Sequence, residues 1–235
     1  MKFRYNADDI LSLPLCIVMN KYLRIRMNNI AIIFAGGSGT RLVNSENKIP
    51  KQFLKIYGKP IIIYTLQLFE EHSLIDKIYI AIHPDYYDFA KDLVKRYHIA
   101  KVAGVVKGGA SSQESIYNAL KLAQSENSND DIVLIHDGVR PNITSEVITK
   151  NIECARKNGN AITCTSCFET ILVSENSKNP DHVPCRKNTY RAQAPQTFKL
   201  GEIISAHDEI RKINPNYNDI VDSCTLFHAL KKDTY

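Results

Sequence analysis

A regular alternation of short apolar runs and amphipathic segments is the feature that most constrains this fold. Five runs rich in Ile, Val and Ala have the length of buried strands, and they lie at 30–34, 77–83, 101–106, 131–137 and 161–167. The segments between them repeat apolar residues with helical periodicity, at 60–72, 85–97, 112–125 and 144–158. Strands buried on both faces and separated by helices predict an α/β fold with a doubly wound, mostly parallel sheet.

The segment 168–192 interrupts this rhythm. It contains two extended pieces around a turn rich in Ser, Asn and Pro, which predicts a β-arm that protrudes from the sheet. Its apolar residues Ile171, Leu172 and Val173 are too exposed on such an arm to stand alone, so we expect a homodimer formed through it. Two helices follow, at 199–211 and near 220–231.

Length and composition set the class of protein. A chain of 235 residues that is 44% hydrophobic and 23% charged is typical of one globular domain. No window approaches the roughly 18 uninterrupted apolar residues of a membrane span. The net charge of +5 is modest and its cations are scattered, which favours an anionic small substrate over nucleic acid. We expect residues 1–29 to be a leader outside the core, residues 30–235 to form the domain, and the protein to be cytoplasmic.

A glycine-rich turn follows the first strand, in the sequence FAGGSGTR at 34–41. It is not a P-loop, because Thr40-Arg41 stands after Gly39 where a Lys-Ser/Thr pair is required. It is not the dinucleotide fingerprint either, since Leu42 occupies the place of the third glycine. Glycines there still allow backbone N–H groups to approach phosphate oxygens, so we expect a different phosphate-binding turn.

Polar loops follow four of the expected strands, at the edge of the sheet where α/β proteins bind ligands. They read AGGSGTR, KGGASSQES, HDGVRP and FETI. Arg41 offers planar donors to phosphate and Lys51 a compact charge. Asp137, at the end of an apolar strand, needs a partner. Two partners are open at this point: an ion pair with Arg140, or Mg²⁺ bound together with a nucleoside triphosphate.

These motifs together carry a resemblance. FAGGSGTR, PKQF, GGASSQESIYNAL, HDGVRP, VPCRKNTYRAQAPQTF and IVDSC, in this order, resemble the cytidylyltransferases that activate sugar-alcohol phosphates. This is the family of 2-C-methyl-D-erythritol 4-phosphate cytidylyltransferase-like nucleotidyltransferases. The valine in HDGVRP, the arm motif and VDSC are closest to those that act on ribitol 5-phosphate. The resemblance implies cytidylyl transfer from CTP, giving CDP-ribitol for teichoic acids or capsules and pyrophosphate, with Mg²⁺ as cofactor.

The resemblance also implies roles for individual residues. Arg41 and Lys51 would stabilise the transition state, and Arg186 would position the alditol phosphate. The residues expected to hold the nucleotide are Phe34, Ala35, Gly36 and Gly37 in the first turn and Gly109, Ala110, Ser111, Ser112, Gln113, Glu114 and Ser115 in the second. Those expected to bind the acceptor are Asp137, Arg140, Thr170 and Arg186, and those near the metal are Asp137 and Asp222. Ser111 and Glu114 also form the pattern of a capping box.

Two departures from the family and three alternatives remain. Ser112 stands where the family usually has arginine. The family also continues beyond Tyr235 into a strand with an acceptor-binding lysine, so we expect the C-terminal end to be truncated. The alternatives are a 2-C-methyl-D-erythritol 4-phosphate cytidylyltransferase, a non-catalytic nucleotide-binding subunit, and a sugar-1-phosphate nucleotidylyltransferase that uses UTP or dTTP.

Overall fold

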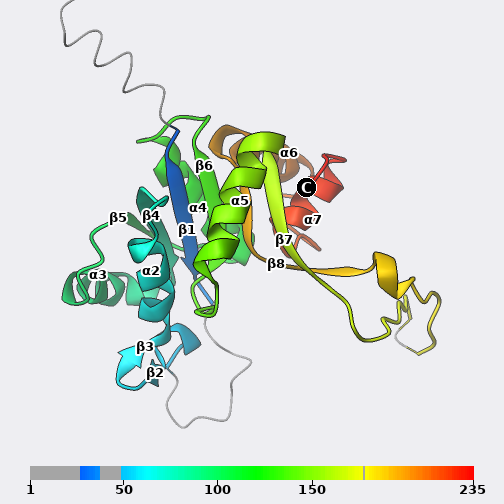
Figure 1. Ribbon diagram of the computed structural model, residues 1–235, viewed down its shortest axis with the longest axis horizontal. Coiled ribbons are helices and arrows are strands. Elements are labelled where there is room, and N and C mark those ends of the chain that lie inside the picture. Colours follow the sequence, from blue (N-terminus) through cyan, green and yellow to red (C-terminus); the bar gives the residue numbers. More distant parts are fainter. Residues whose placement is uncertain (1–26, 38–48, 177) are drawn as a thin grey trace, which may run out of the picture.

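A six-stranded sheet forms the centre of the protein in the computed structural model, which describes residues 27–37, 49–176 and 178–235 (Figure 1). Its strand order is β5-β4-β1-β6-β8-β7. The strands are β1 (Asn29–Ala35), β4 (Lys77–Ile82), β5 (Val102–Lys107), β6 (Ile132–Asp137), β7 (Asn160–Ser166) and β8 (Tyr190–Lys199). All five expected strands are present to within one or two residues. Residues 1–26 of the expected leader (1–29) and Arg41 lie outside the described residues, whereas Asn29 is the first residue of β1.

Strands β5, β4, β1 and β6 form the parallel, doubly wound part of the sheet. β1 pairs in parallel with β4 on one side and with β6 on the other. The chain runs from β1 outward to β4 and β5 and then crosses back to β6, so the winding reverses between β1 and β6. Ligands bind beyond the carboxyl ends of strands at such a reversal. Phe34 in β1 lies opposite Asp137 in β6, which brings the glycine turn and the HDGVRP loop side by side.

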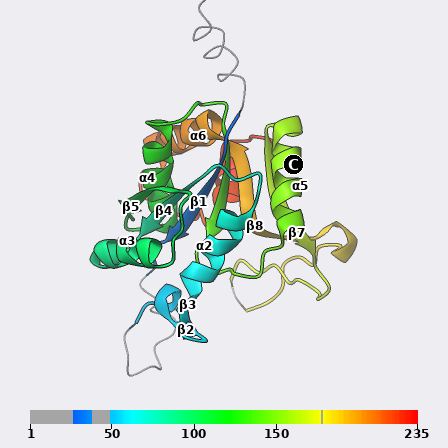
Figure 2. The ribbon, with the colours of Figure 1, turned by 60° about the vertical axis from the view of Figure 1, so that its left-hand side comes forward.

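Helices cover both faces of the sheet, because successive side chains of a buried strand point to opposite faces. Ala31 and Ile33 of β1 pack with helices α2 (Ile61–Glu71), α3 (Tyr87–Arg96) and α5 (Ser145–Asn158). Ile30 and Ile32 pack with α4 (Ser112–Gln124), α6 (Leu200–Ile213) and α7 (Ser223–Ala229). Figure 2 shows α4 and α6 on one side of the sheet and α5 on the other. None of the helices in the described ranges is long and apolar enough to span a membrane.

Strand β8 is the element that sequence patterns do not predict. It runs antiparallel between β6 and β7, so the outer part of the sheet is mixed rather than parallel. Pro195 disfavours a central strand, because proline cannot donate to the ladder. The structure accommodates it at an irregularity: pairing with β6 begins only at Gln196, and the register with β7 shifts between Ile162 and Cys164.

The segment expected to be a β-arm does protrude from the ends of β7 and β8 (Figure 1). It contains little regular strand structure, however. Between β7 and β8 the described residues make one isolated bridge, Val173 to His182, and a short 3₁₀ helix, η5 (Arg186–Asn188). Residues 190–192 belong to β8 in the main sheet. The arm is therefore held by local turns, because it has no hydrophobic layer to cover a hairpin.

Three short elements lie near the carboxyl ends of the strands. The 3₁₀ helix η3 (Lys51–Phe53) follows Pro50, and η4 (Pro84–Tyr86) follows β4. Between η3 and α2, β2 (Lys55–Ile56) and β3 (Lys59–Pro60) form a hairpin. Its turn residues Tyr57 and Gly58 both have positive φ, as a type I′ turn requires.

Candidate active site

Two adjoining cavities open at the carboxyl ends of β1, β5 and β6. The first, of about 280 Å³, we call the glycine pocket; it is lined by Gly36, Gly37, His83, Gly109, Ala110, Ser111, Ser112 and Ser115. The second, of about 350 Å³, we call the charged pocket; its lining includes Phe34, Lys51, Ser112, Gln113, Ile116, Ile135, Asp137, Arg140, Ala192, Gln193, Ala194, Gln196, Val221, Asp222 and Ser223. Ser112 lines both cavities, so they meet at the start of α4.

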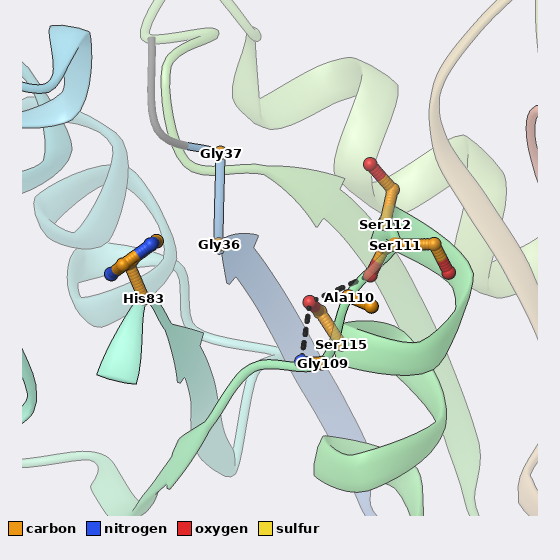
Figure 3. Close-up of a pocket in the computed structure, with 8 residues that line it drawn as sticks. All are labelled: Gly36, Gly37, His83, Gly109, Ala110, Ser111, Ser112 and Ser115. Carbon is orange, nitrogen blue, oxygen red and sulfur yellow. Dashed lines mark hydrogen bonds between the residues drawn. The ribbon is translucent and has the colours of Figure 1, made fainter. Parts of the chain in front are cut away.

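The glycine pocket is built around Ser115, which lies between the two glycine-rich loops (Figure 3). Its hydroxyl donates to the backbone oxygen of Ser111 at 2.8 Å and accepts the backbone N–H of Gly109 at 3.0 Å. A Cβ on Gly36 would lie 2.7 Å from Ser115 Oγ, and one on Gly108 would lie 2.8 Å from it. Glycine is required at both positions because this single hydroxyl fills the space between the loops.

The start of α4 is fixed by a modified capping box. Ser111 caps the helix, with its hydroxyl accepting the Glu114 N–H at 3.1 Å, as expected. The Glu114 carboxylate accepts the N–H of Ala110 at 2.8 Å, one residue before the position that a standard box would use. A Cβ on Gly109 would overlap this glutamate side chain. The loop is therefore rigid, and its glycine leaves room for the capping carboxylate.

Gln52 anchors the motif PKQF against the glycine turn, and it is not among the site residues predicted from sequence. Its side chain is buried, and Nε2 donates to the backbone oxygens of Ala35 at 2.9 Å and Gly37 at 3.1 Å. The adjacent Phe53 packs against Tyr86 and Phe89. Gln52 thus holds the glycine turn at the end of β1, while Lys51, next to it in η3, lines the charged pocket.

The charged pocket brings four ionic side chains to one cavity, Lys51, Asp137, Arg140 and Asp222. Asp137 Oδ1 accepts the N–H of Val139 at 3.0 Å, and Oδ2 lies 3.7 Å from Arg140 Nε. Arg140 also donates to Gln193 of β8 at 2.9 Å. The ion pair with Arg140, one of the two partners left open for Asp137, is therefore formed, although it is long for a hydrogen bond. Lys51 lines the same cavity and supplies a second cation.

Asp222 occupies the far wall, where both of its oxygens are engaged. Oδ1 caps α7 by accepting the Thr225 N–H and hydroxyl at 2.7 Å each, and Oδ2 accepts Gln196 Nε2 at 2.8 Å. Mg²⁺ is usually held by one or two carboxylates together with substrate phosphates. Asp137 fits that arrangement better than Asp222, because the described residues give its Oδ2 only a long ion pair. Nowhere in the described part of the chain do three His, Cys, Asp or Glu side chains form a metal cluster by themselves.

A buried imidazole lies behind Asp137. His136 is 1% exposed, and its Nε2 lies 3.1 Å from the backbone oxygen of Arg140. Burial lowers the pKa of His136 below its ordinary value, since the charged imidazolium would be desolvated. His136 is therefore neutral near pH 7 and supports the HDGVRP loop without adding charge to the pocket.

The structure brings most of the expected site residues together. Those that line one of the two pockets are Phe34, Gly36, Gly37, Lys51, Gly109, Ala110, Ser111, Ser112, Gln113, Ser115, Asp137, Arg140 and Asp222. Ala35 and Glu114 line neither but make the supporting contacts described above. Thr170 and Arg186 lie on the arm and line neither pocket; Arg186 donates instead to the backbone oxygen of Phe168 at 3.1 Å.

Several pocket residues were not anticipated from sequence. Those with polar side chains are His83, Gln193, Gln196 and Ser223, and the apolar ones are Ile116, Ile135, Ala192, Ala194 and Val221. Gln193 and Gln196 belong to β8, whose place in the sheet was missed. The one available signal was the polar character of Gln193 and Gln196 in an otherwise strand-like segment.

Comparison with known proteins assigns the chain to a family. Residues 29–227 match the family model of 2-C-methyl-D-erythritol 4-phosphate cytidylyltransferase (IspD). A ribitol-5-phosphate cytidylyltransferase of Vibrio parahaemolyticus is 42% identical over 198 residues, covering 84% of this chain and 82% of that protein. A 2-C-methyl-D-erythritol 4-phosphate cytidylyltransferase of Clostridium botulinum is 36% identical over 191 residues, covering 81% of each.

The fold agrees with solved structures of the same group. The crystal structure of 4-diphosphocytidyl-2C-methyl-D-erythritol synthase from Anaerococcus prevotii superposes with a TM-score of 0.73 at 27% identity, covering 88% of this chain and 84% of that one. Both the α/β fold expected from sequence and the resemblance are confirmed. The chain belongs to the 2-C-methyl-D-erythritol 4-phosphate cytidylyltransferase (IspD) family and is a nucleotidyltransferase of the cytidylyltransferase class.

Proposed function

We propose that this chain transfers a cytidylyl group from CTP to D-ribitol 5-phosphate, giving CDP-ribitol and pyrophosphate. The observation that carries the proposal is the pair of adjoining pockets of different chemistry, which meet at Ser112. One is lined by small residues and backbone amides, and the other by charged and hydrogen-bonding side chains. A relative named for ribitol 5-phosphate is 42% identical, against 36% for one named for the methylerythritol substrate, which supports ribitol 5-phosphate as acceptor.

The glycine pocket suits CTP. Gly36 and Gly37 leave backbone groups accessible because they lack side chains, and such amides bind phosphate and base oxygens without added charge. Gln52, Ser115 and Glu114 hold both loops in place before the nucleotide arrives. We therefore assign the nucleotide to the Gly36–Gly37 turn and to the loop from Gly109 to Ser115, apart from Gln113, which lines only the charged pocket.

The charged pocket suits the acceptor and the transferring phosphoryl group. An oxygen of the acceptor phosphate attacks the α-phosphorus of CTP, a new P–O bond forms, and the bond to the departing pyrophosphate breaks. The acceptor phosphate is already anionic at neutral pH, so no strong general base is needed. Lys51 would stabilise charge that grows on the α-phosphate and on pyrophosphate, which is the kind of electrostatic assistance that enzymes use most. We assign the same role to Arg41, which lies outside the described residues.

Asp137 is the residue we assign to Mg²⁺. Asp137 lines the charged pocket, and among the described residues its Oδ2 makes only a long ion pair to Arg140. Mg²⁺ bound there with the triphosphate would neutralise part of the phosphate charge. Asp222 would contribute mainly by fixing α7, since its oxygens already serve the helix cap and Gln196.

The arm would complete the site in a homodimer. Phe168, Leu172 and Val183 are 76%, 61% and 51% exposed, a concentration of apolar surface that a monomer rarely shows. Thr170 and Arg186 lie on the same arm, away from both pockets of their own chain. We infer that the arm packs on a second copy and presents these two residues to its charged pocket, where Arg186 would bind the acceptor phosphate.

Two wider assignments follow from the same proposal. We place the reaction in the cytoplasm, where CTP is made, and its product in teichoic acid or capsule synthesis. The competing function is methylerythritol phosphate activation, which the family model and the 36% identical relative favour.

Replacing Lys51 tests the chemical assignment. Lys51→Ala should lower kcat for pyrophosphate release by roughly 10²–10³-fold, the scale of losing one pre-positioned electrostatic stabiliser. CTP affinity should change much less, because the glycine pocket still holds the nucleotide. Lys51→Arg should also fail, since a planar fork does not replace a compact ammonium. Lys55→Ala is the matched control, as this exposed lysine lies in β2 and lines neither pocket. Turnover of Lys51→Ala at the parent rate would show that Lys51 is only a surface charge.

A further inference from the structure

We propose that Gln113 and Ser223 form a polar floor of the charged pocket that recognises the hydroxyl groups of the acceptor's carbon chain. The inference rests on the proposed function, because it takes the charged pocket to be the acceptor site. Gln113 is the second residue of α4, and Ser223 is the first residue of α7. Both helices cover the same face of the sheet, and both side chains line the same cavity.

These two side chains are buried, and the described residues give them no partners. Each residue is 1% exposed, and within residues 27–37, 49–176 and 178–235 neither Gln113 Oε1, Gln113 Nε2 nor Ser223 Oγ has a hydrogen-bond partner. Leaving a buried polar group unpaired costs roughly 1–3 kcal/mol, so native proteins rarely retain such groups without a function. Three unpaired atoms at one cavity therefore point to a ligand that supplies the missing partners.

Gln196 shows that a buried glutamine side chain with a structural role can form its hydrogen bonds in this pocket. It is 6% exposed and lines the same cavity. Its Nε2 donates to Asp222 at 2.8 Å, and its Oε1 accepts the Cys224 N–H at 2.9 Å. Gln113 has the same functional group in the same pocket and makes neither kind of bond. The difference indicates that Gln113 is reserved for the ligand.

The position of Gln113 also separates it from the nucleotide. It lines the charged pocket but not the glycine pocket, whereas its neighbour Ser111 lines only the glycine pocket. We therefore infer that Gln113 binds the acceptor, instead of CTP as expected from its place in the loop. Rotation about the terminal side-chain torsions, which are soft for glutamine, turns the polar ends toward the cavity.

The chemistry of the two side chains fits a polyol. An amide and a hydroxyl each both donate and accept, as sugar-alcohol hydroxyls do. The acceptor's phosphate needs cations instead, and Lys51 and Arg140 line the same cavity. A site built to hydrogen-bond hydroxyl groups discriminates strongly against ligands that lack them, because its own groups then stay unpaired. Gln113 and Ser223 would therefore select for the hydroxylated chain rather than for phosphate.

The test compares Gln113→Met and Ser223→Ala with two controls outside the charged pocket, Gln67→Met at a half-buried position and Ser205→Ala at an exposed one. Each floor variant should raise KM and the calorimetric Kd for D-ribitol 5-phosphate by roughly tenfold, the effect of one lost hydrogen bond in a buried site. Affinity for propyl phosphate, which has no hydroxyl groups, should stay within twofold of the parent. CTP affinity should also be unchanged, and kcat should change less than KM.

Three outcomes would overturn the inference. Unchanged acceptor affinity together with higher thermal stability would make the pair a structural feature only. Weaker CTP binding by Gln113→Met would show that Gln113 contacts the nucleotide. An equal loss of affinity for propyl phosphate would indicate a general change in the pocket. Failure of the proposed function can be told apart from failure of this inference, because the parent protein would then not bind D-ribitol 5-phosphate. In that case the same variants would be measured with 2-C-methyl-D-erythritol 4-phosphate. An unchanged Kd for that ligand would overturn the inference.

Discussion

Gln52 offers the sharpest test of how the fold prepares its nucleotide site. The side chain is 1% exposed, and its amide nitrogen bridges the backbone oxygens of Ala35 and Gly37 at 2.9 and 3.1 Å. Gln52→Met keeps the length of the side chain and removes both hydrogen bonds. Each neutral bond contributes about 1 kcal/mol, and a buried acceptor left unpaired costs more. We therefore expect the free energy of unfolding to fall by about 2–3 kcal/mol.

Thermal unfolding and CTP-binding calorimetry both measure the effect of Gln52→Met. For a domain of this size the loss corresponds to a melting temperature lower by roughly 4–12 °C. The glycine turn must also be re-formed when the nucleotide binds, so calorimetry should show CTP affinity reduced by about tenfold, equivalent to ~1.4 kcal/mol. Gln67→Met is the control, because Gln67 makes a single hydrogen bond, to Lys59, away from the turn. A Gln52→Met protein that melts within 2 °C of the parent and binds CTP equally well would refute the reasoning.

Three further predictions concern the glycine loops, the buried His207 and the arm. Gly109→Ala should abolish CTP binding, because its Cβ would overlap Glu114, whereas Gly37→Ala should be tolerated, since no described residue lies within 4 Å of its Cβ. Equal binding by both variants would contradict these roles of the two glycines. Burial lowers the pKa of His207 to about 3, so this histidine binds a proton in the unfolded chain from about pH 6.5 downward but not in the folded protein. The free energy of unfolding should therefore fall by roughly 1 kcal/mol per pH unit below pH 6.5, and urea unfolding that gives equal stability at pH 7 and pH 5 would exclude this. Leu172→Asp on the arm should convert a dimer to a monomer in sedimentation at micromolar concentration, and a monomeric parent would rule out the dimer.

The parallel half of the fold was predictable because each strand is buried on both faces. Runs such as IAIIF at 30–34 have no polar face, so only a sheet covered by helices can hold them. Strand β8 was not predictable in the same way. It contains Pro195 and alternates polar residues, and its place between β6 and β7 depends on tertiary pairing that local sequence does not encode.

The candidate site also has a predictable part and an unpredictable part. Glycines and cations in short motifs indicated both pockets, because the chemistry of each such residue is evident from its type alone. Gln52, Gln196 and Ser223 were missed, since an uncharged polar residue gains its role only from the atoms around it. The capping box shows the limit of pattern reading: Ser111 caps α4 as expected, but Glu114 bonds to Ala110 instead.

The acceptor of this enzyme is identified by measuring pyrophosphate release from CTP with two acceptors side by side. We predict that kcat/KM for D-ribitol 5-phosphate exceeds that for 2-C-methyl-D-erythritol 4-phosphate by at least tenfold, which corresponds to ~1.4 kcal/mol of transition-state discrimination. The product should be CDP-ribitol, identified by its mass. A reversed preference, or release of pyrophosphate from UTP or dTTP as fast as from CTP, would contradict the account.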